Sequence, residues 1–149
     1  MKTTTDEAKA LLVRAIAAVP DLTYFGVGIG DGYRVRREKG REFVRQETAR
    51  LQAELFTHLD EIATCADWLK HLEPIKGITP GLHSYGHKHR VEGWTEANGE
   101  RQYIANGSFI AAAIGLGFTY RIIVGTPNVA FGFSKRSLRE LERSVRAAA

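Results

Sequence analysis

Residues 83–117 have the sequence HSYGHKHRVEGWTEANGERQYIANGSFIAAAIGLG, which predicts two helices around which the fold is organised. We expect Ser84 to be the N-cap of the first helix, because a side-chain oxygen there can accept from the first unpaired N–H groups. Asn106 is predicted to cap the second helix in the same way. Asn98 and Gly99 tolerate positive φ and favour a turn between the two helices.

The second predicted helix is apolar on nearly every side. No charged residue occurs between Gly107 and Leu116. A helix that is apolar all round is buried in the protein interior. We therefore expect residues 107–116 to form the central helix of the core.

Helical signals also mark the segments before this stretch. Thr4 and Glu7 have the spacing of a capping box, and the apolar helical pattern that follows them ends at Pro20. Thr57 and Asp60 have the same spacing and predict a second capping box. The helix after it contains Cys65 on an apolar face, where a lone cysteine is expected to be a small buried hydrophobe.

Two later segments favour β-structure. Residues 118–124 and 129–133 are rich in branched and aromatic residues and flank a Gly-Thr-Pro-Asn turn, which predicts a hairpin. A lone hairpin is marginally stable, so we expect it to recruit residues 22–29 as a third strand or to pack on the apolar helix. The sequence thus predicts a single α+β domain over residues 1–149, with about six helices packed on a short antiparallel sheet or hairpin.

Composition is that of an ordinary globular chain. Its 149 residues are 44% hydrophobic and 26% charged, and the single cysteine cannot form an internal disulfide. The N-terminal residues contain acids where a leader would be apolar, and no apolar run approaches the roughly 18 to 20 residues of a membrane span. We therefore expect a cytoplasmic protein with no membrane contact.

The positive charge is concentrated in two parts of the chain. Residues 33–57 contain seven basic and four acidic residues, residues 102–149 contain six and two, and the whole chain has a net charge of +4. The rest of the chain is therefore net negative, because +4 minus the +3 and +4 of these parts leaves −3. Clustered charge of this kind favours an anionic partner.

Helical spacing places these basic residues in two arginine stripes. One helix over residues 33–55, with Gly40 on its inward side, would align Arg34, Arg37, Arg41 and Arg45. A final helix capped by Ser134 would align Arg136, Arg139, Arg143 and Arg146. Both stripes are candidate phosphate contacts. The alternative for the first stripe is a solvated face on which Glu38 and Glu42 pair with Arg41 and Arg45.

Three histidines lie close together in the sequence but do not have the spacing of a metal site. His83 and His87 could share a helix face, whereas His89 would point elsewhere, and no cysteine pair completes a ligand set. We expect His87 to be half-buried and hydrogen-bonded, and His83 and His89 to lie at the surface. No cofactor or metal is predicted.

The segments SYGHKHRVE and YIANGSFIAAAIGLGF resemble a family of small proteobacterial proteins associated with plasmids, phages and integrative elements. The family has no established activity, so the resemblance implies a genomic setting and transfers no catalytic residue. His87 occupies a position where the family usually has leucine. The residues that match the motif and have no assigned role are Tyr85, Lys88, His89, Glu92, Asn106 and Gly107.

Three functional hypotheses follow. The first is a non-enzymatic accessory protein of a mobile genetic element that binds DNA or RNA phosphates through the arginine stripes. The second is a protein-binding inhibitor of a host defence complex, such as a restriction or CRISPR nucleoprotein. The third is a metal-assisted hydrolase or nuclease that uses His87, His89 and Glu92.

Overall fold

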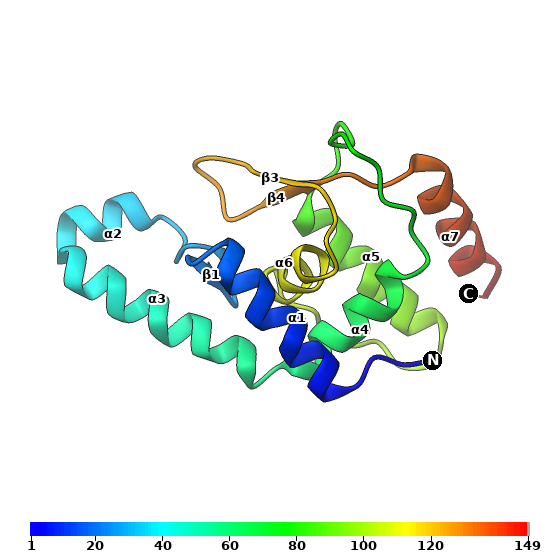
Figure 1. Cartoon of the computed structure of the whole chain (residues 1–149), viewed down its shortest axis with the longest axis horizontal. Coiled ribbons are helices and arrows are strands. Elements are labelled where there is room, and N and C mark those ends of the chain that lie inside the picture. Colours follow the sequence, from blue (N-terminus) through cyan, green and yellow to red (C-terminus); the bar gives the residue numbers. More distant parts are fainter. Residues whose placement is uncertain (149) are drawn as a thin grey trace.

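The computed structural model describes residues 1–148, which form seven α-helices and four short β-strands (Figure 1). In chain order these are α1 (Thr5–Ala18), β1 (Leu22–Thr23), β2 (Gly26–Val27), α2 (Gly32–Lys39), α3 (Arg41–Phe56), α4 (Leu59–Leu69), α5 (Ser84–Ala97), α6 (Asn106–Gly115), β3 (Tyr120–Ile122), β4 (Val129–Phe131) and α7 (Lys135–Ala148). The fold is α+β, as the sequence predicts.

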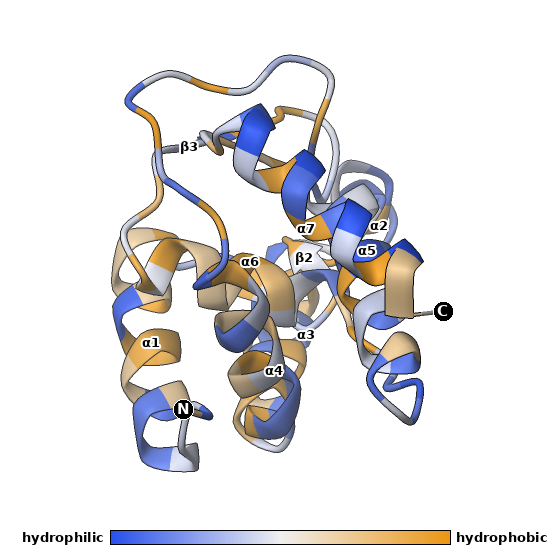
Figure 2. Cartoon of the chain, turned by 90° about the vertical axis from the view of Figure 1, so that its right-hand side faces the viewer, coloured by the Kyte–Doolittle hydropathy of each residue, from blue (hydrophilic) through white to orange (hydrophobic). Residues whose placement is uncertain are grey.

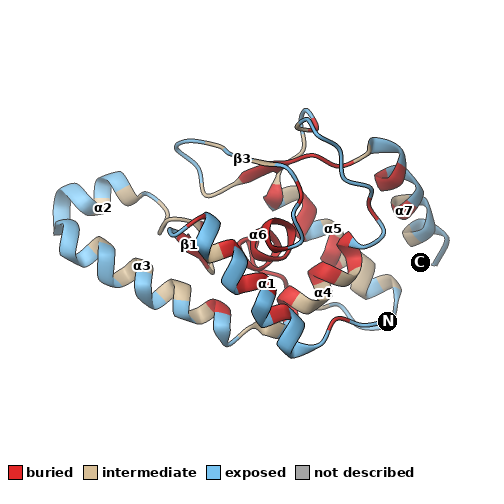
Figure 3. Cartoon of the chain, in the orientation of Figure 1, coloured by how far each residue is buried: buried red, intermediate tan, exposed pale blue. Residues whose placement is uncertain are grey.

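Helix α6 is the centre of the core, and all ten of its residues are buried. Helices α1, α4 and α5 pack around it (Figures 1 and 3). The approach of α1 is close, because a Cβ atom built on Gly115 would lie 2.5 Å from the backbone oxygen of Leu11. Small residues in α6 therefore allow neighbouring backbones to approach it directly. The predicted polar helix, turn and apolar helix are confirmed by α5, the turn at Asn98–Gly99 and α6.

The first helix begins as predicted. The Thr4 side chain accepts a hydrogen bond from the backbone N–H of Glu7, and the Glu7 side chain accepts from the backbone N–H of Thr4. The buried face of α4 includes Cys65, and burial raises the pKa of its thiol well above the usual value. The cysteine is therefore a buried thiol in the core.

The second predicted capping box, Thr57 with Asp60, is wrong. Thr57 follows the last residue of α3 and its hydroxyl donates to the Glu54 carbonyl oxygen at 2.7 Å. His58 is the N-cap residue of α4, and its side chain makes no capping hydrogen bond. The hydroxyl is therefore used to end one helix rather than to begin the next.

The predicted caps at Ser84 and Asn106 are also wrong. Both residues lie inside their helices as the first residue, and Ser84 Oγ accepts from the Val129 N–H at 3.0 Å. At the start of α6, the carboxylate of Glu61 accepts from the Ala105 N–H at 2.8 Å. These helix starts are buried, so their polar groups bond to distant segments rather than to a local cap.

The predicted single helix over residues 33–55 is interrupted at Gly40, whose φ of +90° breaks the helical backbone. Two helices, α2 and α3, result, and α2 folds back over the outer half of α3 (Figure 1). The expected position of Gly40 on an inward helical face is therefore wrong. A residue with φ in this range is rarely anything but glycine.

The β-structure consists of two separate antiparallel pairs. β1 pairs with β2, and β3 pairs with β4 through Arg121 opposite Ala130, which confirms the predicted hairpin. Residues 22–29 do not form its third strand, although the Val27 N–H donates to the Pro127 oxygen at 2.9 Å. Instead the hairpin packs on the apolar helix, because the ring of Phe131 lies 5.8 Å from that of Phe109.

Helix α7 ends the described chain and begins with the predicted cap. Ser134 Oγ accepts from the Ser137 N–H at 3.2 Å, while Leu138 and Leu141 are buried beneath the helix. The hydrophilic side of α7 faces outward (Figure 2). Among residues 1–148, no helix combines the length and the apolar character that crossing a membrane requires.

Candidate functional site

Helices α2 and α3 form an arm that projects from one end of the molecule (Figure 1). We call residues 32–56 the arm. No residue of α2 is buried, and Leu55 is the only buried residue of α3. Most of the arm is therefore surface (Figure 3), and its basic side chains are accessible.

Three arginines of the arm are paired with nearby carboxylates. Arg34 lies 2.7 Å from Asp31, Arg45 lies 2.6 Å from Glu42, and Arg50 lies 2.8 Å from Glu47. The expected Glu42–Arg45 pair is confirmed, whereas Glu38 and Arg41 do not pair. The basic residues of the arm that pair with no carboxylate in residues 1–148 are Arg36, Arg37, Lys39 and Arg41.

Exposed aromatic rings lie beside two of these unpaired cations. The Arg37 guanidinium is 5.9 Å from the centroid of the Tyr33 ring, and Lys39 Nζ is 4.9 Å from that of Phe43. Tyr33 is 80% exposed. Cations and accessible rings are the two elements with which proteins hold single-stranded nucleic acid.

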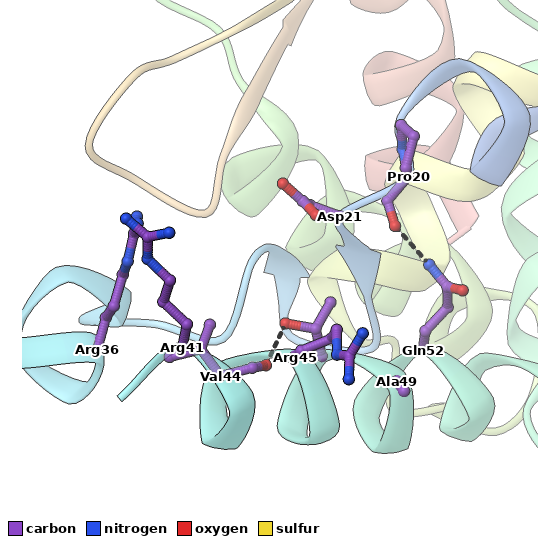
Figure 4. A pocket seen from close by; sticks show the side chains of 9 residues that line it. Pro20, Asp21, Arg36, Arg41, Val44, Arg45, Ala49 and Gln52 are labelled. Carbon is purple, nitrogen blue, oxygen red and sulfur yellow. Dashed lines mark hydrogen bonds between the residues drawn. The ribbon is translucent and has the colours of Figure 1, made fainter. Parts of the chain in front are cut away.

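The inner side of the arm encloses a hollow of about 430 Å³ against the loop at Pro20 and Asp21 (Figure 4). Arg36 and Arg41 project into it from either side of the helix break, with Asp21 across the opening (Figure 4). Gln52 Nε2 fixes the base of the arm by donating to the Pro20 oxygen at 2.8 Å and the Leu22 oxygen at 2.9 Å. The two guanidinium groups thus face a common space without a carboxylate bound to either.

The predicted first stripe is not one stripe in the structure. Arg34 and Arg37 belong to α2, whereas Arg41 and Arg45 belong to α3, because the helix breaks at Gly40. All four side chains are nevertheless exposed. The fold groups Arg36 with Arg41 instead, and helical spacing across an unbroken helix could not reveal this pair.

The second stripe lies on α7, at the end of the molecule opposite the arm (Figures 1 and 2). Its four residues, Arg136, Arg139, Arg143 and Arg146, are all exposed. Arg136 lies 3.3 Å from Glu140, and it is the member of the stripe with an ion pair to residues 1–148. The two basic surfaces therefore do not share one face.

The motif residues of α5 converge on a buried carboxylate. Glu92 accepts from the Ile104 N–H at 3.0 Å, contacts His89 Nδ1 at 2.8 Å and accepts from Arg101 at 3.3 Å. Burial raises its pKa, but the Ile104 and His89 hydrogen bonds and the charge of Lys88 outweigh this and lower it below the usual value. The carboxylate is therefore ionised and well supplied with donors.

Lys88 is the least expected residue of this group, because it is only 5% exposed. Its Nζ lies 3.5 Å from Glu92, 4.6 Å from the Tyr103 ring centroid and 5.5 Å from that of Tyr85. No hydrogen bond joins this ammonium group to residues 1–148. This largely buried lysine is thus stabilised by the charge of Glu92 and by the faces of two tyrosine rings, and not by a hydrogen bond.

Asn106 and Gly107 join the start of α6 to the β1–β2 hairpin. The Gly107 N–H donates to the Tyr24 oxygen at 3.1 Å, and a Cβ atom here would lie 1.8 Å from the Thr23 oxygen. Asn106 Nδ2 has three acceptors, namely the backbone oxygens of Phe25 and Pro127 and the side-chain oxygen of Asn128, at 3.1 to 3.3 Å. These two motif residues therefore hold the β1–β2 hairpin against the start of α6.

His87 points away from this group and into the core. It is fully buried, its ring stacks on that of Phe109 at 5.5 Å, and Phe133 packs edge-on at 4.9 Å. Burial, with the nearby charges of Arg90 and His83, lowers its pKa to about 3. The half-buried position predicted for His87 is therefore wrong, whereas the predicted hydrogen bond is confirmed, because Arg90 Nη1 lies 3.4 Å from His87 Nδ1.

His89 contacts Glu92, but His87 lies in the core, so the three residues of the predicted hydrolase site are not brought together. Exposure of His89 is confirmed, but His83 is half-buried and its Nδ1 has no partner in residues 1–148. Over residues 1–148, no group of three His, Cys, Asp or Glu side chains is arranged to hold a metal ion. The grouping of His87, His89 and Glu92 in one site is wrong, because His87 faces the opposite side of α5.

Glu61 is an important buried residue that sequence periodicity did not single out. Its carboxylate accepts from the Ala105 N–H at 2.8 Å, Ser108 Oγ at 3.0 Å and the Tyr24 hydroxyl at 2.8 Å. Burial, followed by this bond to Glu61, raises the pKa of Tyr24. The sequence offers little signal for it, because the same helix also contains the acids Asp60 and Asp67.

No protein-family model, curated protein or solved structure matches this chain. Its function has to be inferred from its own residues.

Proposed function

We propose that this protein is a non-enzymatic nucleic-acid-binding accessory protein that holds phosphates with its arm. One observation carries the proposal: the arm exposes Arg36, Arg37, Lys39 and Arg41 without carboxylate partners in residues 1–148. Basic side chains on a projecting, poorly buried element are free to neutralise phosphates and release their counterions. The resemblance to plasmid and phage proteins adds a mobile element as the proposed setting.

The aromatic residues of the arm favour single-stranded or locally opened nucleic acid. Tyr33 and Phe43 lie beside Arg37 and Lys39, so a strand that contacts these cations would place its bases within reach of the rings. Stacking of this kind is tolerant of sequence. We therefore expect binding without strong sequence preference.

Helix α7 supplies a second contact surface in this proposal. Because it lies at the opposite end from the arm (Figure 1), a short duplex held by the arm would not reach it. Phosphate contacts position a nucleic acid without specifying its sequence. The α7 stripe should thus add affinity for long nucleic acid more than for short oligonucleotides.

The test is fluorescence anisotropy with labelled short single-stranded and duplex DNA, titrated over a range of salt concentrations. Substituting Arg36, Arg37 and Arg41 by glutamine should lower the slope of log K against log[salt] by about 2 to 3, because each lost phosphate contact contributes roughly 0.7 to 0.9. The matched control substitutes Arg34, Arg45 and Arg50, which are paired with acids, by glutamine.

The control removes the same formal charge from the same arm. A smaller effect of the control would support contacts by the unpaired arginines, whereas equal effects would indicate a response to net charge alone. No binding by the unmodified protein at about 50 mM salt would overturn the proposal. That result would favour the inhibitor hypothesis, which predicts tight binding to a host nucleoprotein complex.

A further inference from the structure

A second hollow, of about 710 Å³, lies between the β1–β2 hairpin, the first turn of α5 and the start of α6. Small-molecule sites in proteins have volumes of roughly 300 to 1,000 Å³. The hollow contains none of the arginines of the arm or of α7. It is therefore a separate candidate site. Its volume is large enough for a nucleobase with an attached sugar.

Four aromatic rings form much of its lining, and they come from three places in the chain. Tyr24 and Phe25 belong to the turn of the β1–β2 hairpin, Tyr85 belongs to α5, and Tyr103 precedes α6. Tyr85 is held in place by an edge-on contact with His89, with ring centroids 4.7 Å apart. Surfaces of this kind bind flat rings by stacking.

Lys88 supplies the positive charge of the hollow. Its ammonium group has three donors and lies 3.5 Å from the Glu92 carboxylate in an ion pair, but it makes no hydrogen bond to residues 1–148, and the residue as a whole is 5% exposed. Glu92 balances the charge of Lys88 but forms its hydrogen bonds with Ile104, His89 and Arg101, which leaves the lysine N–H donors unused. Unused donors in a largely buried place are unfavourable, and an anionic group in the hollow would accept hydrogen bonds from them.

Amide side chains complete the lining at the start of α6. Asn106 and Asn128 both face the hollow, and Asn106 Oδ1 has no donor in residues 1–148. Amides offer a donor and an acceptor to the edge of a heterocycle. The hollow thus combines stacking rings, one cation and an amide pair.

We propose that this hollow binds a nucleotide, with the base between the tyrosines and the phosphate on Lys88. The nucleotide is free or is the end of a strand, since both present the same base and phosphate. All six motif residues take part. Tyr85, Lys88 and Asn106 line the site, while His89 and Glu92 support its wall and Gly107 lets the hairpin close against α6.

The test is NMR titration of the ¹⁵N-labelled protein with AMP, GMP, CMP and UMP. At least one should bind with a Kd below about 1 mM and shift the amide signals of residues around the hollow. Ribose 5-phosphate and the matching nucleoside should each bind at least about tenfold more weakly, because each lacks one half of the ligand. The substitution Lys88→Met should weaken the affinity for the nucleotide by about tenfold or more.

The matched control is Lys9→Met, which removes an exposed lysine from α1 and should leave nucleotide binding unchanged. If Lys88→Met does not fold, Tyr103→Ala replaces it, since Tyr103 is 62% exposed. Failure of all four nucleotides to bind with a Kd below about 1 mM would overturn the proposal. Unchanged nucleotide affinity in Lys88→Met would also overturn it. If Tyr103→Ala is used instead, unchanged affinity in that variant has the same meaning.

A 5′-phosphorylated dinucleotide distinguishes the two sources of ligand. Tighter binding than the mononucleotide assigns the hollow to a strand end, and equal or weaker binding assigns it to a free nucleotide. This inference does not depend on the role proposed for the arm. Glutamine substitutions in the arm should leave mononucleotide binding unchanged, and Lys88→Met should leave the salt dependence of duplex binding unchanged.

Discussion

Burial of His87 should make the stability of this protein depend on pH below the ordinary pKa of histidine. The folded pKa of His87 is about 3, against an ordinary value of 6.5. Between these values the unfolded chain binds a proton that the folded chain does not. The stabilisation is therefore present above pH 6.5 and is lost as the pH falls toward 3.

The magnitude follows from the same two values. A pH of 5 lies about 1.5 units below the pKa of the imidazole in the unfolded chain. Each unit corresponds to roughly 1.4 kcal/mol, so the free energy of unfolding should fall by about 2 kcal/mol. Substituting His87→Leu should remove this loss, because leucine does not titrate. Leucine also suits a site formed by Trp68, Phe109 and Phe133.

The assay is urea unfolding followed by circular dichroism at several pH values between 5 and about 7.5. The free energy of unfolding of the unmodified protein should fall by about 2 kcal/mol more than that of His87→Leu over this range. The pKa of Glu92 is lowered from 4.5, so its contribution is lost only below the range. His71→Gln, at an exposed histidine, is the matched control. Parallel pH profiles for the unmodified protein and His87→Leu would refute the reasoning.

Three further predictions, two of them with a control variant, can be checked by the same unfolding assay at pH 7.5. Gly107→Ala should cost more than about 3 kcal/mol or prevent folding, because its Cβ would clash with the Thr23 backbone oxygen. Gly77→Ala is the control, because its Cβ would meet nothing within 4 Å and its φ is not positive, and it should change stability by less than about 1 kcal/mol. A similar cost for Gly107→Ala and Gly77→Ala would contradict the predicted clash. Gly40→Ala should cost about 1 to 2 kcal/mol through its positive φ, and a neutral effect would mean that the arm can straighten. Thr4→Ala should cost about 1 kcal/mol by removing the cap of α1, and Thr57→Ala, outside any such cap, should cost less.

Local patterns in the sequence were sufficient where neighbouring residues decide the structure. The capping box at Thr4 and the cap at Ser134 depend on contacts within three residues, and the β3–β4 hairpin joins two neighbouring segments. The apolar helix at residues 107–116 was equally predictable, because its composition leaves no side for solvent.

Patterns failed where a distant residue took over a local role. The start of α6 is satisfied by Glu61, which lies 44 residues earlier in the chain, and Ser84 bonds to a strand 45 residues later. Helical spacing also extended the first arginine stripe through Gly40, since periodicity says nothing about a positive φ. The unpaired Arg36 and Arg41 and the buried Lys88 could be recognised only after the chain was folded.

Two glycines of the central helix α6 limit how the sequence of this protein can change in evolution. At Gly115 and Gly107, backbones of α1 and the β1–β2 hairpin lie where any larger residue would place its first carbon. An added methyl group there cannot be accommodated by a new rotamer, because the obstacle is main chain and not side chain. The arm has no such restriction over α2 and most of α3. Homologues should therefore keep the glycines of α6 while varying the length and charge of the arm, and a search based on α6 should find relatives that a search based on the arm would miss.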